Sequence, residues 1–314
     1  MSGVNERLRT YLDWMRGANP SLAAVNSGLR FAVDCSNGMA SLIAGELFPG
    51  AVILNRELDG SFPNHSPNPL LPEARGQLVR AVREGRLDAG VIFDGDADRA
   101  MFVDERGEFV QPDYLIPVVA EATRRLRPES PRPVRIIHDV RTSRGAIETL
   151  RERGMEPVMV PVGHAFAKPI LRKVGALCGG ELAGHYYFSE FYGCDSGMLA
   201  ALRILGELAR AKAVGLTFSG LMRPIVSRYA NSGEINFRVE DKDAAIARVL
   251  ACAAESFGAE VARSEIDGVR LDYADGWLNV RKSNTEPYLR LLVECRAAGQ
   301  LADWTERLQR AIEG

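Results

Sequence analysis

The sequence predicts an α/β protein with two consecutive βαβ-type mixed-sheet domains, followed by a smaller α+β domain at the C-terminal end. Three observations support this fold class. Short apolar strands alternate with helical segments, an order typical of parallel sheets covered by helices. The same order starts again after the proline-rich segment Pro128–Pro133. After about residue 228 the pattern changes to alternating strands and a β-hairpin, which indicates antiparallel pairing.

The composition is that of a globular protein rather than a disordered one. Hydrophobic residues make up 46% and charged residues 25% of the 314 residues, enough for the cores of two or three domains. Lys and Arg number 39 and Asp and Glu 41, so the net charge of −2 offers no general attraction for nucleic acid or an anionic membrane. The N-terminus lacks the apolar stretch of a signal peptide, and no run approaches the ~18 apolar residues of a membrane span. Five scattered cysteines indicate neither disulfides nor a zinc knuckle, so we expect a cytoplasmic protein.

The first domain is expected to span residues 1–127. Apolar residues at helical spacing predict a helix over residues 4–16, which Asn19-Pro20 ends before a linker. From Leu29 onward strands, turns and helices alternate. The predicted strands cover residues 29–35, 51–55 and 89–93, the helices residues 39–48 and 73–84, and a Pro/Asn-rich loop residues 56–72.

The second domain, residues 128–228, follows the same order. In both domains an apolar strand ends in an aspartate, Asp34 or Asp139, before a serine-containing turn, which is consistent with internal duplication. The predicted strands are residues 134–140, 156–161 and 176–180, and the helices residues 144–154, 165–174 and 195–213.

The third domain, residues 229–314, has alternating strands. The segment 269–283 predicts a hairpin that turns at Asp275-Gly276. A strand at residues 234–239, a helix at 243–258 and a strand at 288–295 complete the predicted elements.

The most specific local signal is FDGDADR, residues 93–99, which directly follows a buried strand. Asp94, Asp96 and Asp98 alternate with glycine and alanine, whose small side chains let the backbone curl so that three carboxylates converge on one cation. The carboxyl end of a strand is also where α/β sheets bind ligands. Mg²⁺ is the predicted ion, because it takes a few carboxylates and keeps positions for water or phosphate.

An EF-hand calcium loop is a competing interpretation of this segment, since Glu105 lies at position twelve of such a loop. However, Arg99 occupies position six, where the sharp turn needs glycine, and a strand rather than a helix precedes the loop. A solvated acidic turn is the other alternative. Three like charges so close together repel one another unless a cation neutralises them, which favours the metal site.

Two further segments carry binding chemistry, although each could also be an ordinary polar turn. In GELAGH, residues 180–185, Glu181 could accept hydrogen bonds from sugar hydroxyls, and His185 could transfer a proton or bind an anion. There is no GxxxxGK[ST] or GxGxxG nucleotide loop and no GxSxG elbow. The segment RKSNTEP offers a guanidinium, two hydroxyls and an amide that together suit a phosphate dianion, from Arg281, Ser283, Thr285 and Asn284.

With these three segments in this order, the chain resembles the α-D-phosphohexomutases, the phosphomannomutase/phosphoglucomutase family. FDGDADR resembles the family's metal loop, GELAGH its sugar-binding GEMSGH loop, and RKSNTEP its phosphate-binding loop. Weaker matches occur at PNHSPNP, DVRTS, VGHAFAK and the Asp195-containing FYGCDSG. The resemblance covers nearly the whole chain and implies the second, third and fourth domains of a four-domain enzyme.

The resemblance also implies a role for each segment. Mg²⁺ would bind the three aspartates, Arg99 would steady the phosphoryl group in transfer, and His185 would act in catalysis, while Glu181 holds ring hydroxyls. The implied ligands are mannose or glucose 1- and 6-phosphates and hexose 1,6-bisphosphate. The other implied substrate contacts are Arg141, His164, Arg281, Ser283, Asn284 and Thr285.

One part of the family pattern is not found in these 314 residues. The family's first domain carries a phosphorylated serine in a TASHNP-like loop, and no such loop is present. Ser66 matches a proline-rich loop of the second domain instead, and we do not expect it to be the nucleophile. The resemblance therefore implies a truncated product, or a chain that works with a first domain supplied by a separate polypeptide.

Smaller departures from the family pattern concern specificity. Ala183 stands where the family usually has serine, which removes one hydroxyl partner of the sugar, and Arg141 replaces a lysine. Asn284 favours hexose phosphates over glucosamine phosphate, whose mutases have glycine there.

Three functional hypotheses follow. The leading one is the Mg²⁺-dependent interconversion of hexose 1-phosphate and hexose 6-phosphate through a bisphosphate. The alternative is a non-catalytic phosphosugar-binding or regulatory protein. A metal-dependent phosphatase, in which water replaces the serine, is disfavoured because the metal loop contains no obvious base.

Overall fold

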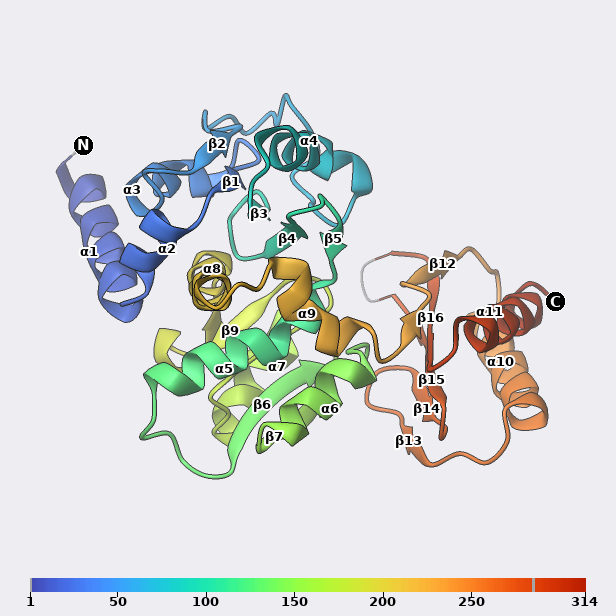
Figure 1. Cartoon of the computed structure of the whole chain (residues 1–314). Coiled ribbons are helices and arrows are strands. Elements are labelled where there is room, and N and C mark those ends of the chain that lie inside the picture. Colours follow the sequence, from blue (N-terminus) through green and yellow to red (C-terminus); the bar gives the residue numbers. More distant parts are fainter. Residues whose placement is uncertain (1, 284–285) are drawn as a thin grey trace.

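The computed structural model describes residues 2–283 and 286–314 and confirms the predicted fold class. It has two five-stranded mixed sheets, followed by a sheet of antiparallel strands with its own helices (Figure 1). Asn284 and Thr285, predicted as phosphate ligands, lie outside the described residues.

The first sheet has the strand order β2-β1-β3-β4-β5. Strand β1 is parallel to both β2 and β3, whereas β4 runs antiparallel to β3. Its strands are β1 (Phe31–Asp34), β2 (Val52–Leu54), β3 (Ala89–Phe93), β4 (Ala100–Asp104) and β5 (Phe109–Val110). The helices of this part are α1 (Ser2–Ala18), α2 (Leu22–Gly28), α3 (Ala44–Leu47) and α4 (Gly76–Gly85).

The second sheet repeats this topology with the order β10-β9-β8-β6-β7. Strand β6 is parallel to β7 and β8, and β9 runs antiparallel to β8, so each strand has a counterpart in the first sheet. Its strands are β6 (Val134–Asp139), β7 (Met155–Val160), β8 (Cys178–Gly180), β9 (Tyr186–Phe188) and β10 (Cys194–Asp195). The helices are α5 (Ile116–Leu126), α6 (Arg144–Glu152), α7 (His164–Val174), α8 (Gly197–Ala213) and α9 (Phe218–Val226).

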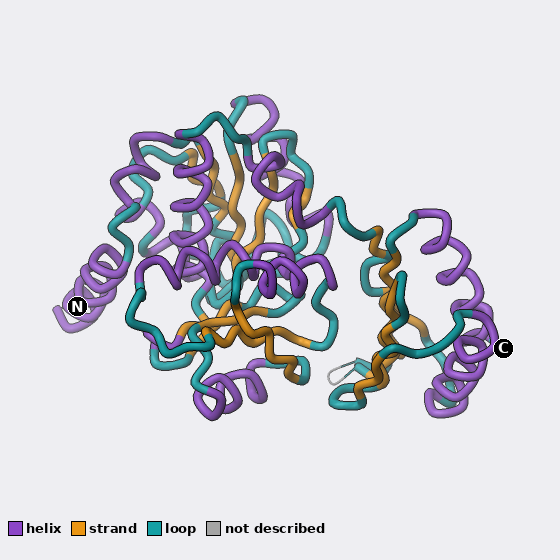
Figure 2. Tube along the Cα trace, turned by 60° about the horizontal axis from the view of Figure 1, so that its bottom comes forward, coloured by secondary structure: helices purple, strands orange, loops and turns teal. Residues whose placement is uncertain are grey.

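The third sheet has the order β11-β16-β15-β14-β13, with β12 also paired to β16. The predicted hairpin at Asp275-Gly276 is confirmed, because β14 and β15 pair antiparallel across this turn. The two helices lie on the outer side of the sheet, away from the other domains (Figures 1 and 2). The elements are β11 (Ala230–Asn231), β12 (Ile235–Phe237), α10 (Lys242–Ser256), β13 (Ala262–Ser264), β14 (Val269–Asp272), β15 (Gly276–Lys282), β16 (Leu289–Cys295) and α11 (Ala298–Glu313).

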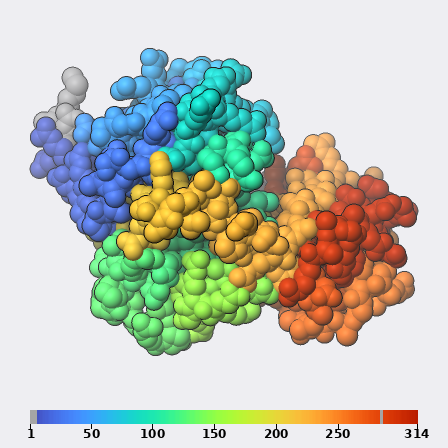
Figure 3. Space-filling view, in the orientation of Figure 1, coloured from blue at the N-terminus to red at the C-terminus, as the bar shows by residue number. Residues whose placement is uncertain are grey.

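One hydrophobic core joins the first two domains, whereas the third has its own. Helix α8 is apolar on most of its faces and is buried, as expected for a helix without a polar side. In the space-filling view the segment containing α8 and α9 lies across the boundary between the first and second domains (Figure 3). Phe102 of β4 meets Phe218 of α9 with ring centroids 6.0 Å apart. The two domains are therefore one packed unit that holds its loops in a fixed relation.

The structure differs from the sequence prediction in several elements. The segment after Pro20 was expected to be a linker, but Leu22–Gly28 forms α2, with Val25 fully buried. The sequence predicts one helix over residues 39–48, but the structure has a 3₁₀ turn (Met39–Leu42) followed by the short helix α3. The elements that the sequence pattern does not predict are β4, β5, β9, β10, β11, β13, α5, α9 and α11. Among the described residues, no helix has both the length and the apolar character needed to cross a bilayer.

Candidate active site

The three predicted segments come together where the domains meet. The metal loop, residues 94–99, follows β3, and the sugar loop, residues 181–185, follows β8, at equivalent ends of the two repeated sheets. Arg99 and His185 form an antiparallel bridge, and the Ala100 amide donates to the Gly184 carbonyl at 3.2 Å. The bridge holds the two loops against each other across the domain boundary.

The sugar loop also contacts the third domain. Leu182 forms a small buried apolar cluster with Trp277 of β15 and Leu292 of β16. The phosphate segment begins with Arg281 in the last residues of β15, and Arg281 shares the Glu234 carboxylate with Arg141, which lies 3.8 Å from Glu181 of the sugar loop. Loops from three domains therefore border one region of the molecule.

The predicted metal loop brings its three carboxylates together. Asp94, Asp96 and Asp98 each place a carboxylate oxygen within 4.8 Å of the others. Ala97, between two of them, has a φ of 63°, so the chain curls tightly at this point. Within the described residues, the Oδ1 atom of Asp98 is buried and has no hydrogen-bond partner. Oxygen-only donors and an unsatisfied buried carboxylate oxygen fit a hard divalent cation.

The turn after β1 supports the metal loop from one side. The Met39 amide donates to the Gly95 carbonyl at 2.9 Å. A Cβ atom on Gly38 would lie 2.4 Å from the same carbonyl oxygen, so only glycine permits this approach. Within the loop, the Arg99 guanidinium donates to Asp94 at 2.7 Å. One contact with the neighbouring turn and one internal contact thus fix the loop conformation.

A second cluster of charged groups surrounds His185. Its Nδ1 atom lies 3.0 Å from Asp195 Oδ2 and 3.6 Å from Asp98 Oδ2. Asp195 uses its other oxygen, Oδ1, to pair with Lys168 Nζ at 2.7 Å. His164, at the start of α7, places its ring edge-on to that of His185 with centroids 6.0 Å apart.

Charge interactions in this cluster shift the ionisation of its members. Burial raises the pKa of Asp98, and the nearby Asp94 and Asp96 carboxylates raise it further, although the His185 charge opposes them. Burial disfavours a charged His185, but its hydrogen bond to Asp195 and the charge of Asp98 outweigh this and raise its pKa. Despite its burial, His185 and Lys168 hold the pKa of Asp195 at about 2. His185 is therefore suited to hold a proton or an anion near the metal loop.

Glu181 of the sugar loop is almost fully buried and hydrogen-bonded. Tyr187 donates its hydroxyl to Oε1 at 2.5 Å, and the Gly163 amide donates to Oε2 at 3.2 Å. Burial and the neighbouring Asp139 charge raise its pKa. These contacts orient the carboxylate, and each oxygen retains a lone pair for a ligand hydroxyl.

Arg141, predicted to contact substrate, is buried at 3% exposure. Its guanidinium pairs with Asp139 at 2.6 Å and lies 3.8 Å from Glu181 and 3.4 Å from Glu234. In this conformation Arg141 links the turn after β6 to the sugar loop and to the third domain. A ligand contact from Arg141 remains a prediction.

In the phosphate loop, Arg281 is paired with carboxylates of its own chain. Its guanidinium lies 3.2 Å from Glu234 Oε1 and 3.9 Å from Asp267. Arg290 contacts the other Glu234 oxygen at 2.9 Å. Despite burial, Arg141, Arg281 and Arg290 together lower the pKa of Glu234, which therefore stays ionised. A phosphate that binds Arg281 must compete with this carboxylate.

The structure thus brings together most of the predicted residues and adds several others. Ser283 directly follows β15, and its hydroxyl accepts from the Glu286 amide at 3.2 Å. The residues that sequence reasoning did not assign are Lys168, Asp195, Tyr187, Glu234 and Arg290. Lys168 and Asp195 lie in two of the segments that matched the family weakly, which was the one signal available for them.

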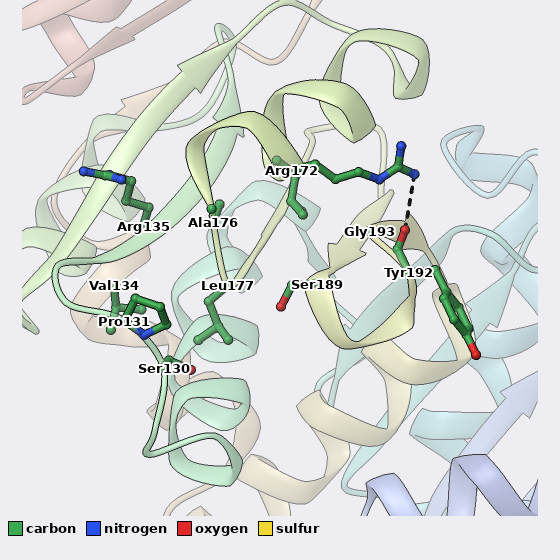
Figure 4. A pocket seen from close by; sticks show the side chains of 12 residues that line it. Ser130, Pro131, Val134, Arg135, Arg172, Ala176, Leu177, Ser189, Tyr192 and Gly193 are labelled. Atoms are coloured by element: carbon green, nitrogen blue, oxygen red, sulfur yellow. Dashed lines mark hydrogen bonds between the residues drawn. The ribbon is translucent and has the colours of Figure 1, made fainter.

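A separate pocket of about 480 Å³ lies in the second domain, away from these loops. Its lining includes Arg135, Arg172, Ser189 and Tyr192, and Arg172 donates to the Tyr192 carbonyl at 3.2 Å (Figure 4). None of its lining residues belongs to the metal, sugar or phosphate loop. The pocket is therefore distinct from the candidate active site.

Comparisons with known families agree with this arrangement of domains. The model of phosphoglucomutase/phosphomannomutase alpha/beta/alpha domain II matches residues 9–107, and that of domain III matches residues 111–229. The model of the phosphoglucomutase/phosphomannomutase C-terminal domain matches residues 234–311.

Individual relatives and a solved structure are similar over nearly the whole chain. A phosphomannomutase of Vibrio cholerae is 38% identical over 296 residues, which cover 91% of this chain and 62% of the relative. Phosphohexose mutases of Xanthomonas campestris are 37% identical over 292 residues, with 91% and 63% covered. The crystal structure of a phosphoglucomutase/phosphomannomutase family protein from Burkholderia thailandensis has a TM-score of 0.77 and 30% identity, covering 94% of this chain and 64% of that one. The chain thus spans less than two thirds of the length of these relatives.

Proposed function

The chain belongs to the phosphoglucomutase/phosphomannomutase family, and from this premise we propose that it forms the metal-, sugar- and phosphate-binding part of a phosphohexomutase. The reaction would interconvert hexose 1-phosphate and hexose 6-phosphate through a hexose 1,6-bisphosphate. The observation that carries the proposal is the meeting of three ligand loops from three domains, with Arg99 and His185 bridged across the first boundary.

In this proposal Asp94, Asp96 and Asp98 hold Mg²⁺. The bound ion would supply positive charge to the oxygens of the phosphoryl group in transfer. The chain's own contribution is the shape of the loop, which Met39 and Gly38 support. Because the donors are all carboxylates, the site suits Mg²⁺ better than a transition metal.

Arg99 and His185 act on the phosphoryl group and the attacking hydroxyl. Arg99 lies beside the carboxylates through its contact with Asp94, so its charge can stabilise a transferring phosphoryl group. His185, with its raised pKa, carries a proton at Nδ1 toward Asp195. We assign it to proton transfer, with Asp195 and Lys168 as the groups that position it.

The sugar and its second phosphate would bind the other two loops. Glu181, fixed by Tyr187, accepts hydrogen bonds from two ring hydroxyls, with His164 nearby at the start of α7. The phosphate takes the place of Glu234 on Arg281 and reaches Ser283. The further contacts that we assign from the sequence are Arg141, Asn284 and Thr285.

The phosphorylated serine of the reaction would come from outside these 314 residues. The assay that tests this combines the chain with a separately produced serine-bearing first domain of a relative, mannose 1-phosphate, Mg²⁺ and glucose 1,6-bisphosphate. We expect mannose 6-phosphate only when both polypeptides are present, and no product with Asp96→Asn. The first domain alone is the control for contaminating activity.

Two results would contradict the proposal in different ways. Binding of the sugar phosphate without turnover would indicate a phosphosugar-binding or regulatory protein instead. Turnover by the chain alone would show that it contains its own phosphoryl acceptor.

A further inference from the structure

We infer that Asp98, His164, His185 and Asp195 form a second metal site, which takes a borderline transition metal of the Zn²⁺ class rather than Mg²⁺. One donor atom of each residue lies within 4.8 Å of all the others. The four residues come from the metal loop, the start of α7, the sugar loop and β10. The site therefore spans the first and second domains.

Two of the donor distances are close to those of a four-coordinate zinc site, and the others are no longer than 4.8 Å. Tetrahedral ligands with bonds of about 2.0 Å lie about 3.3 Å from one another. His185 Nδ1 is 3.0 Å from Asp195 Oδ2 and 3.6 Å from Asp98 Oδ2, on either side of that value. His164 is exposed, and one of its ring nitrogens lies within 4.8 Å of the other three donor atoms.

The chemistry of the donors separates this site from the aspartate triad. Two imidazoles and two carboxylates suit Zn²⁺ and its neighbours in the first transition series, whereas Mg²⁺ prefers oxygen ligands in octahedral geometry. The triad offers carboxylates only. The two sites therefore differ in the metal that each prefers.

Two of the donor atoms already contact each other, because His185 Nδ1 hydrogen-bonds Asp195 Oδ2 at 3.0 Å, so a metal must displace the proton that they share. Asp195 uses Oδ1 for Lys168, at 2.7 Å, and turns Oδ2 toward His185. Asp98 has a buried Oδ1 without a hydrogen-bond partner in the described part of the chain and turns Oδ2 toward His185. The cations facing the cluster are Lys168 and Arg99, whose Nε lies 3.8 Å from Asp98 Oδ1. These two cations weaken metal binding, whereas the negative charge of the Glu181 carboxylate strengthens it.

Asp98 belongs to both sets of ligands, which couples the two sites. A metal that uses Asp98 together with the histidines removes one of the three Mg²⁺ ligands. The same metal also occupies His185. The transition metal therefore inhibits the mutase reaction, a consequence that rests on the proposed function. A chelator selective for transition metals would then restore activity.

The test is a metal titration with two variants that separate the sites. Co²⁺, a spectroscopic substitute for Zn²⁺, is titrated while its visible absorption is recorded, and Zn²⁺ and Mg²⁺ binding are measured by calorimetry. We expect intense visible bands of four-coordinate Co²⁺ that Zn²⁺ displaces. His164→Ala should weaken Co²⁺ and Zn²⁺ binding at least tenfold and leave Mg²⁺ binding unchanged. Asp96→Asn should weaken Mg²⁺ binding and leave Co²⁺ and Zn²⁺ binding unchanged, because Asp96 belongs to the triad alone.

The control variant is His65→Gln, which removes a histidine that faces Asp34 in the first domain. It should bind all three metals as the unchanged chain does, and circular dichroism confirms that each variant is folded. The inference is overturned if no four-coordinate Co²⁺ spectrum develops, or if His164→Ala binds Zn²⁺ unchanged. A near-ultraviolet thiolate charge-transfer band would also overturn it, because the metal would then sit on a cysteine. Because these readouts require no turnover, a failed mutase assay with intact Co²⁺ binding would reject only the proposed function.

Discussion

Replacing Arg270 with methionine should loosen the attachment of the third domain. Arg270 of β14 is 1% exposed and donates to the carbonyl oxygens of Val140 and Thr142 at 2.6 and 3.1 Å, in the turn of the second domain that carries Arg141. It also pairs with Asp272 at 3.0 Å. The variant leaves two carbonyls and part of the partly buried Asp272 carboxylate unsatisfied, while methionine keeps the apolar packing.

The expected loss follows from these contacts. Removing one partner of a buried ion pair costs about 3–5 kcal/mol. Asp272 keeps a second partner, because Arg144 donates to it at 2.9 Å, so the lower end of that range applies. We therefore expect Arg270→Met to reduce the unfolding free energy of the third domain by about 3 kcal/mol.

Urea unfolding followed by tryptophan fluorescence measures this change, because the third domain contains the buried Trp277 and Trp304. The matched control is Arg263→Met on β13, whose exposed guanidinium pairs with Glu265. An exposed pair is worth about 0–1 kcal/mol, so this variant should unfold nearly as the unchanged chain does. A loss below about 1 kcal/mol for Arg270→Met would refute the reasoning, since the contacts would then not hold the domains together.

Three further predictions concern the loops and their supports. Gly38→Ala should weaken Mg²⁺ binding severalfold in calorimetry without removing a ligand, because its Cβ collides with the metal loop; unchanged affinity would mean that the loop can move aside. The hydrogen bond to Asp34 raises the pKa of His65, so its stabilisation is complete below the unfolded pKa of about 6.5 and is lost as the pH rises through the folded pKa. The melting temperatures at pH 6 and pH 8 should therefore differ less in His65→Gln than in the unchanged chain. If the two differences are equal, the contact between His65 and Asp34 does not stabilise the fold. Tyr187→Phe removes the hydroxyl that donates to Glu181 and should lower stability by about 1–3 kcal/mol in thermal unfolding, whereas a neutral result would mean that the carboxylate finds another donor.

The sequence predicted the fold class because it depends on local patterns, whereas the binding roles of the three loops stay predictions. Asp94, Asp96 and Asp98 follow one another closely after a buried strand, so their convergence is visible in the sequence itself. The hairpin at Asp275-Gly276 is likewise a local signal. The two-residue strands β5 and β10 are too short to show a pattern, and they form because an adjacent strand offers its free edge.

Contacts between distant segments could not be predicted in this way. Glu234 meets Arg141 and Arg281 only because the third domain packs against the second. The pairing of Lys168 with Asp195 joins α7 to β10, and nothing in either segment specifies the other. Helix α2 forms where the sequence predicts a linker, because its apolar residues pack on α8, which lies far away in the sequence.

The central claim, that loops of the second and third domains hold one hexose phosphate, is tested most directly by calorimetry with mannose 1-phosphate in the presence of Mg²⁺. We predict one saturable site whose affinity falls at least tenfold in Glu181→Gln and in Arg281→Gln. Arg172→Gln, in the separate pocket of Figure 4, should bind as the unchanged chain does. If no saturable binding occurs, or if it survives both loop substitutions, the claim is contradicted.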